Sequence, residues 1–277
     1  MKYKIVTDSS SNVFEFSGVP YACVPMKIRT TEKEYVDTAD MDVSGMVEDL
    51  QAYTGTTRSS CPNIQEWINA FEGADCIFAV TITSNLSGSY NAAMNAREQF
   101  LEDHPSAKIC VIDTLSAGPE LELVIELIRD RILAGDSFEE IEAAARKYLK
   151  RTHLLFTLKS LNNLARNGRV NPAVAKIAGV LGICLLGKAS DEGTLEPLHK
   201  CRGERSLLKN LFAEFQKLGY KGGKVRISHC LNLPLAQKVA ELLREQYPRC
   251  DIKINACSGL CSFYAEKGGF LIAIEDG

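Results

Sequence analysis

Short clusters of Ser and Thr stand where apolar runs of this sequence end. They lie at residues 7–11, 56–60, 83–89 and 114–116, with Ser258 later in the chain. At the carboxyl ends of parallel strands, hydroxyl groups can donate hydrogen bonds to an anion without adding a charge. Helix caps and turns explain any single cluster. Five clusters together favour a site for an oxyanion or another polar ligand.

The sharpest cluster is Leu86-Ser87-Gly88-Ser89-Tyr90. It follows a predicted strand and opens a predicted helix, so free N–H groups and the Ser87 hydroxyl would favour a carboxylate or phosphate. Gly88 would let a ligand approach the backbone closely. The segment lacks the glycines and Lys of a P-loop, and it is not the Gly-x-Ser-x-Gly turn of serine hydrolases. We therefore expect an anion-binding helix start here.

These clusters need a scaffold, and the first half of the chain alternates strand and helix patterns. Apolar runs at 2–7, 75–82 and 108–112 predict strands. One helix is predicted by the spacing of Leu121, Val124, Ile125, Ile128 and Ile132, and the next by a capping box at 137–140. Such alternation predicts an α/β fold whose N-terminal domain has a mainly parallel sheet with flanking helices.

The second half predicts a mixed α/β domain. Helices are expected at 159–165, 207–218 and 235–247, and strands at 183–188, 194–200, 224–228, 251–256 and 270–274. The first two of these strands flank a predicted hairpin turn at 190–193. We place the domain boundary near His153, which gives an N-terminal domain of residues 1–153 and a C-terminal domain of residues 154–277.

The composition excludes several classes of function. The 277 residues carry a net charge of −3, without the basic excess of a nucleic-acid-binding protein. The longest apolar run, residues 177–187, is too short to span a bilayer. Since no secretory signal pattern is present, the ten cysteines predict reduced thiols and a cytoplasmic protein. The His and Cys spacings predict no metal site.

Several segments, in order along the chain, resemble the successive motifs of the DegV family. They are Val6-Thr7-Asp8-Ser9-Ser10, Ser59-Ser60-Cys61-Pro62, residues 83–90, Val111-Ile112-Asp113-Thr114, and a leucine-rich segment at 161–170 containing Gly168-Arg169. The Leu-Ser-Gly of residues 86–88, followed by Ser-Tyr, is the strongest element of the set. The resemblance runs over essentially the whole chain and implies the two-domain α/β fold of that family.

The resemblance also implies a function. A DegV protein encloses one long-chain fatty acid in an apolar tunnel between its domains. It presents the carboxylate to a fatty acid kinase, which makes the acyl phosphate. By this likeness the chain is a carrier without catalytic residues or a cofactor, and it touches membranes only transiently. We expect the tunnel walls at residues 177–186 and at other apolar residues facing the domain junction.

Matching motifs assign expected roles to individual residues. Ser59 occupies a position where the family usually has Thr, so the hydroxyl is kept. Ser87 would donate a hydrogen bond to the carboxylate, with Gly88 beside it. Arg169 would lie near the head group, as a ligand contact or as a charge facing the kinase. In the segment 255–261 we expect Cys257 and Ser258 at the ligand, although Cys257 replaces a family His and is only a weak donor.

A second departure from the family pattern is Asn167, which replaces the first Gly of a Gly-Gly-Arg motif. Asn tolerates a left-handed backbone, so this change is expected to be minor. Asp8 and Asp113 end predicted strands and are expected to hydrogen-bond neighbouring loops. The Glu-rich stretch at 120–126 predicts a solvated helix face, and His229 is expected to pack rather than bind ligand.

Two other functions stay open at this point. Ser87 at a helix start also fits the nucleophile of a hydrolase or acyl transferase, provided that a base lies within hydrogen-bond reach. The absence of a family His at position 257 makes such a base harder to find. Alternatively, the same oxyanion site and apolar tunnel fit a carrier for another amphipathic acid.

Overall fold

The computed structural model describes residues 1–171 and 182–277, and its first half builds a four-stranded parallel sheet. The strand order is β2 (Tyr21–Val24), β1 (Tyr3–Asp8), β6 (Cys76–Thr81) and β7 (Lys108–Asp113). Every pairing in this first sheet is parallel, which confirms the predicted sheet type. Strand β2 was not predicted, because four residues are too few to show a period.

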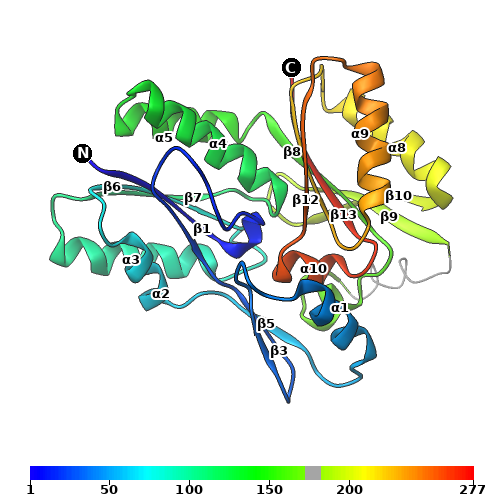
Figure 1. Cartoon of the computed structure of the whole chain (residues 1–277), viewed down its shortest axis with the longest axis horizontal. Coiled ribbons are helices and arrows are strands. Elements are labelled where there is room, and N and C mark those ends of the chain that lie inside the picture. The colour runs from blue at the N-terminus through cyan, green and yellow to red at the C-terminus, as the bar shows by residue number, and fades with distance from the viewer. Residues whose placement is uncertain (172–181) are drawn as a thin grey trace.

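Helices cover both faces of the first sheet (Figure 1). One face packs on α2 (Ile64–Phe71) and α3 (Ser89–Asp103), and the other on α4 (Pro119–Ala134) and α5 (Phe138–Tyr148). Side chains of β6 point alternately to the two faces, so Ile77 packs in the core with α2 and α3, and Phe78 packs in the core with α4 and α5. A strand buried on both faces is apolar throughout, as the run at 75–82 indicates.

A small antiparallel sheet lies beside the first one. Its order is β4 (Glu34–Val36), β3 (Lys27–Arg29) and β5 (Arg58–Ser60), and helix α1 (Val43–Ala52) lies between β4 and β5 in sequence. Three-residue strands carry no readable pattern, so the sequence did not predict this sheet. It places Ser59 and Ser60 on a strand rather than in a turn.

The second half forms a six-stranded mixed sheet, in which five strands were predicted and the strand at residues 152–158 was not. Its order is β10 (Leu195–Arg202), β9 (Ile183–Ala189), β8 (Thr152–Leu158), β13 (Phe270–Glu275), β11 (Lys224–His229) and β12 (Asp251–Ala256). Only the β11–β12 pairing within it is parallel. Strand β8 begins beside the domain boundary placed near residue 153, and that boundary stays a prediction.

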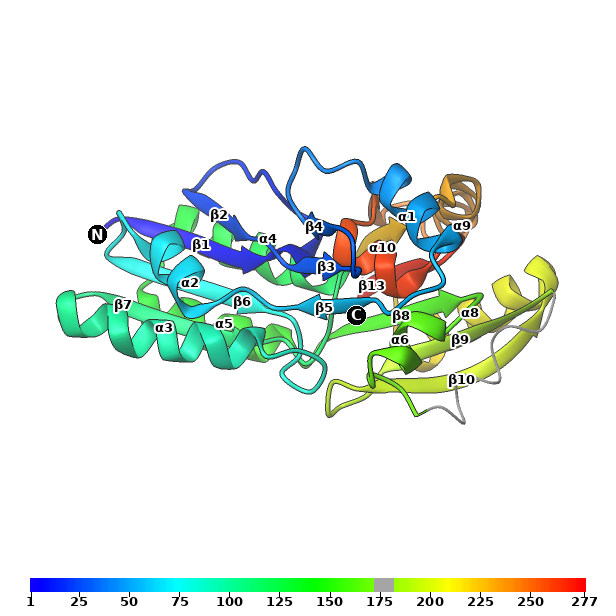
Figure 2. The ribbon, with the colours of Figure 1, turned by 90° about the horizontal axis from the view of Figure 1, so that it is seen from below.

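The two faces of the second sheet have different neighbours (Figure 2). Helices α8 (Gly203–Lys217) and α9 (Leu233–Gln246) cover one face, where Leu155 of β8 packs. Leu154, Phe156 and Leu158 point the opposite way, towards α10 (Gly259–Ala265) and α6 (Asn162–Arg166). This second face turns towards the small sheet and the 3-10 helix η1 (Ser9–Ser11), so segments of both halves meet there.

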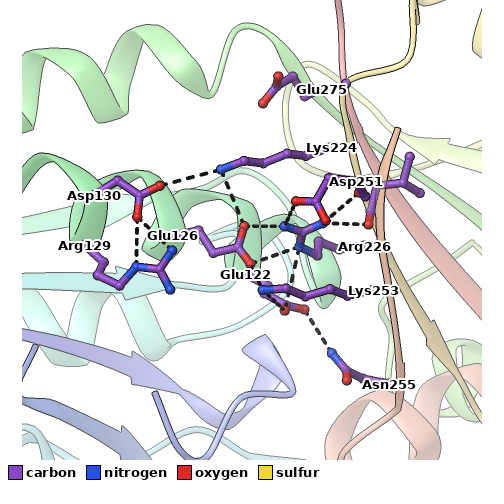
Figure 3. A network of polar contacts seen from close by, with 12 residues as sticks. Glu122, Glu126, Arg129, Asp130, Lys224, Arg226, Asp251, Lys253, Asn255 and Glu275 are labelled. Carbon is purple, nitrogen blue, oxygen red and sulfur yellow. Dashed lines mark hydrogen bonds and ion pairs between the residues drawn. The ribbon is translucent and has the colours of Figure 1, made fainter. Parts of the chain in front are cut away.

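The expectation of a solvated face at residues 120–126 is wrong. Helix α4 lies between the two large sheets and packs on β11 and β13 as well as on the first sheet, so Glu120, Glu122 and Glu126 are at most 6% exposed. The acidic side chains of α4 face basic residues of β11 and β12 (Figure 3). Polar partners in the second sheet therefore replace the water that the sequence pattern suggested.

All ten cysteines are free thiols. Within residues 1–171 and 182–277, no helix is long and apolar enough to cross a membrane.

Candidate functional site

A cavity of about 270 Å³ opens between the second sheet and the first half of the chain. Its walls are mainly apolar and include Leu154, Phe156 and Leu158 of β8, with Leu260 and Leu271. Two other hollows, of about 320 and 480 Å³, are lined mainly by polar and charged residues. The first cavity is thus the one suited to an extended apolar ligand.

Hydroxyl groups from three of the predicted clusters meet on the wall of this cavity. They belong to Ser59 and Ser60 of β5, to Thr83 and Ser87 after β6, and to Ser116 after β7. Parallel strands end at one edge of a sheet, so β6 and β7 deliver their following loops to the same place. The cluster at 7–11 and Ser258 are buried nearby without forming part of the lining.

Ser87 and Gly88 lie at the start of α3, as expected. The Ser87 Oγ accepts a hydrogen bond from the Ser89 N–H at 3.2 Å, which leaves the Ser87 proton available to a ligand. A Cβ atom on Gly88 would lie 3.2 Å from the Cys61 Sγ, so a side chain there would crowd the cavity wall. The positive end of the α3 dipole adds to the anion-binding character of this wall.

Ser59 reaches the cavity together with Tyr264 of α10, which the sequence reasoning missed. The Ser59 Oγ and the Tyr264 hydroxyl oxygen lie 2.6 Å apart and share a hydrogen bond. Burial raises the pKa of Tyr264, so its hydroxyl stays protonated at neutral pH. The sequence did not indicate Tyr264, because this residue lies just beyond the segment 255–261 and outside the motifs that resemble the family.

Arg169 is the only charged side chain among the described residues that line the cavity. Its Nε donates to the Leu86 carbonyl at 3.1 Å, and its Nη1 donates to the Asn167 carbonyl. The turn before it uses a left-handed backbone at Gly168, with φ 72°, whereas Asn167 has φ −95°. Asn167 therefore does not adopt the left-handed backbone that was considered for it, and Gly168 is the left-handed residue of this turn.

Cys257 and Ser258 lie outside the cavity lining, and their contact with the ligand stays a prediction. Cys257 is 2% exposed and its N–H donates to the His229 carbonyl. The Ser258 hydroxyl donates to the Ser9 carbonyl at 2.9 Å, so this turn faces η1. The lining residues supplied by the following helix are Leu260, Cys261, Tyr264 and Ala265.

Of the wall predicted at residues 177–186, the described residues 182–186 do not line the cavity. Residues 177–181 lie outside the described residues. Leu185 and Leu186, in the described part, pack in the cores on either side of the second sheet and do not line the cavity. Instead, the hairpin of β9 and β10 contributes Ala189, Gly193, Thr194 and Leu195, because its turn reaches across to the first half of the chain.

Asp8 and Asp113 hydrogen-bond neighbouring loops, as expected. Asp8 accepts the N–H of Ile82 at 3.0 Å, and Asp113 accepts the N–H of Ser84 at 3.2 Å. The two carboxylates therefore fix the loop that leads to Ser87. His229 does not line the cavity, and its Nδ1 accepts the N–H of Asn232. Among the described residues no group of His, Cys, Asp and Glu could hold a metal ion.

Comparison with known proteins gives a consistent answer over the whole length. The sequence model of a family described as "Uncharacterised protein, DegV family" matches residues 2–276. A DegV domain-containing protein of Streptococcus pneumoniae is 42% identical over 279 residues, covering 99% of each chain.

Two solved structures are similar to this chain in both sequence and shape. A DegV family protein from Eubacterium eligens, loaded with heptadecanoic acid, is 42% identical, with a TM-score of 0.98 over 99% of this chain and 100% of that one. The Streptococcus pneumoniae Fatty Acid Kinase (Fak) B3 protein, loaded with linoleic acid, is 41% identical, with a TM-score of 0.98 over 100% of both chains. The chain belongs to the DegV family.

Proposed function

We propose that this protein binds one long-chain fatty acid in the cavity between its two halves and presents the carboxylate to a fatty acid kinase. The observation that carries the proposal is the lining of the cavity, in which apolar walls adjoin a group of hydroxyls and the guanidinium of Arg169. The two solved relatives loaded with heptadecanoic and linoleic acid support it.

The physical chemistry of a fatty acid fits a cavity with apolar walls and one polar end. Each buried methylene contributes about 0.8 kcal/mol, so a long acyl tail contributes roughly 10 kcal/mol before entropy costs. The ionised carboxylate loses water on entry and needs donors in return. Ser59, Ser87, the backbone beside Gly88, and Arg169 are the proposed donors. The tail thus supplies most of the affinity, while the polar end fixes the orientation of the carboxylate.

We further propose that the protein is a carrier rather than a hydrolase or acyl transferase. A serine nucleophile needs a base to take its proton. Within the described part of the chain, the hydrogen-bond partner of the Ser87 Oγ is the Ser89 N–H, which is a donor. Cleavage of a fatty acyl ester by the wild-type protein, lost in a Ser87→Ala variant, would restore the enzyme alternative.

The remaining parts of the proposal concern partners and location. The kinase partner is inferred from the similarity to the Streptococcus pneumoniae kinase component, and transient membrane contact follows from the low solubility of the ligand. A net charge of −3 supports the absence of a nucleic-acid partner. Ten free thiols support a reducing, cytoplasmic location.

The test is mass spectrometry of an organic extract from freshly purified protein, with extract from denatured, washed protein as the control. We expect one fatty acid per chain. An empty extract, followed by failure to take up added oleate or palmitate, would contradict the proposal. Recovery of a different amphipathic acid at the same ratio would keep the carrier function and replace the ligand.

A further inference from the structure

Asp8 is a fully buried carboxylate that joins three of the segments around the polar end of the cavity. Its exposure is 0%. Oδ1 accepts the N–H of Ser10 in η1 at 3.2 Å, while Oδ2 accepts the N–H of Ile82 at 3.0 Å and the Ser89 hydroxyl at 2.6 Å. No Lys, Arg or His of the described residues pairs with it, and burial raises its pKa against the hydrogen bonds from Ser10, Ser89 and Ile82.

These contacts hold Ser89 in place beside Ser87. The Ser89 hydroxyl donates to the Asp8 Oδ2, which ties the first residue of α3 to the end of β1. The Ser89 N–H in turn donates to the Ser87 Oγ at 3.2 Å. With one lone pair of the Ser87 Oγ occupied in this way, the Ser87 proton is left to donate to another acceptor. Ser87 lines the cavity, so a ligand carboxylate can be that acceptor.

We propose that Asp8 is a positioning residue for carboxylate recognition, which holds Ser89 so that the Ser87 hydroxyl donates into the cavity. Asp8 itself does not touch the ligand, since it is absent from the lining. This inference rests on the proposed function, because it concerns how the fatty-acid carboxylate is distinguished from an uncharged head group. It assigns a role to the cluster at 7–11 that its position outside the lining had left without one.

The experiment compares two ligands of equal chain length, hexadecanoic acid and hexadecanol, on wild-type protein and on Asp8→Ala. We expect the wild type to prefer the acid. Asp8→Ala is expected to reduce that preference by about 10-fold or more, which is the usual effect of losing a hydrogen bond to a charged group, while alcohol binding changes little. An equal loss of affinity for both ligands, or no loss for either, overturns the proposal.

Asp37→Ala is the matched control. Asp37 is also a buried carboxylate, with an exposure of 1%, but it accepts from Ser9, Gly259 and Leu260 rather than from the loop that carries Ser87. It is expected to lower the melting temperature and leave the acid-to-alcohol ratio unchanged. A ratio that falls equally in Asp37→Ala would reduce the effect of Asp8 to general stability and overturn its positioning role.

Ser89→Ala tests the same link with a smaller change and serves if Asp8→Ala does not fold. It removes the hydroxyl bonded to Asp8, and we expect the same loss of acid preference. An unchanged preference in Ser89→Ala overturns the inference. If the wild type binds neither ligand, both the proposed function and the positioning role of Asp8 are wrong. If the wild type prefers the acid and the variants keep that preference, the positioning role of Asp8 alone is wrong.

Discussion

The guanidinium of Arg226 and the carboxylate of Glu126 form a two-bond ion pair between the two halves of the chain. The Nε–Oε1 distance is 3.0 Å and the Nη2–Oε2 distance is 2.6 Å, and both side chains are 1% exposed. Asp251 and Lys253 join the pair from β12 (Figure 3). Burial opposes ionisation of Glu126, but the hydrogen bonds from Arg226 and Lys253 outweigh it and keep its pKa below the ordinary range.

Arg226→Ala is expected to lower the free energy of unfolding by about 3–5 kcal/mol, because Glu126 would stay buried without its main partner. Urea denaturation measures this change. Lys238→Ala breaks an exposed pair with Glu204 and should cost about 1 kcal/mol or less. Replacing both partners, as Glu126→Leu with Arg226→Met, should recover much of the loss. A loss in Arg226→Ala no larger than in Lys238→Ala would show that the buried pair contributes little.

Stability should fall with rising pH through Glu120. Burial raises the pKa of Glu120 in the folded protein, with hydrogen bonds from Ser116 and Thr152 opposing the rise. The contribution of the protonated form is therefore present below the pKa of the unfolded chain and is lost as the pH rises through the folded-state pKa. Glu120→Gln cannot ionise, so its stability relative to wild type should increase as the pH rises above the ordinary Glu pKa of 4.5 and through the raised folded-state pKa. A constant difference in urea denaturation across that range would contradict this.

Ser87→Ala should weaken fatty-acid binding by roughly 10- to 100-fold, the range expected for one hydrogen bond to a charged group. Ser84→Ala is the control, because Ser84 lies on the same loop but does not line the cavity. Binding is measured by displacement of a fluorescent fatty acid, and acyl-phosphate formation is measured with an added fatty acid kinase. Equal behaviour of the two variants would remove Ser87 from the site.

Arg169→Gln should weaken binding of hexadecanoic acid and leave binding of its methyl ester nearly unchanged, since only the acid carries a charge. The expected loss for the acid is about 10-fold or more. Arg166→Gln, one turn earlier on α6 and outside the cavity lining, is the matched control. If Arg169→Gln binds the acid as wild type but forms less acyl phosphate, Arg169 would act towards the kinase instead.

Gly193→Ala should loosen the hairpin turn that closes one wall of the cavity. Gly193 has φ 75°, and an added Cβ would lie 2.9 Å from both the Cα and the carbonyl oxygen of Leu115. Gly203 has a similar φ of 72° with nothing within 4 Å, so Gly203→Ala carries the left-handed strain of about 1 kcal/mol without the clash. We expect faster dissociation of bound fatty acid only in Gly193→Ala. Equal rates in both variants would show that the turn does not hold the ligand.

The sequence predicted the elements best where a strand or helix is long and buried on one or both faces. The apolar runs at 75–82 and 108–112 became β6 and β7, and the capping box at 137–140 opens α5. Local hydrogen bonding and side-chain period determine such elements. Strands of three or four residues, including the β5 strand that carries Ser59, have too few positions for a period and were missed. The seven-residue strand β8 was missed as well.

The candidate site was predicted in part. Ser59, Ser87, Gly88 and Arg169 belong to local motifs, and all four line one cavity. Cys257 and Ser258 share a comparable motif but lie outside the lining, with Ser258 bonded to Ser9 of η1, because the direction of a turn depends on what packs against it. Tyr264 lines the same cavity and is hydrogen-bonded to Ser59, some two hundred residues earlier in the chain. No local pattern contains such a pair.

The sequence by itself determined the α/β class, the family and the hydroxyl-rich loops, because these depend on residue type, period and short motifs. The tertiary structure decided which of those loops meet and what becomes of each charge. Residues 120–126 show the difference, since Glu126 would be solvated on an isolated helix and is instead 1% exposed against Arg226. Burial and pairing are set by the packing of α4 between two sheets, and that packing joins residues a hundred positions apart.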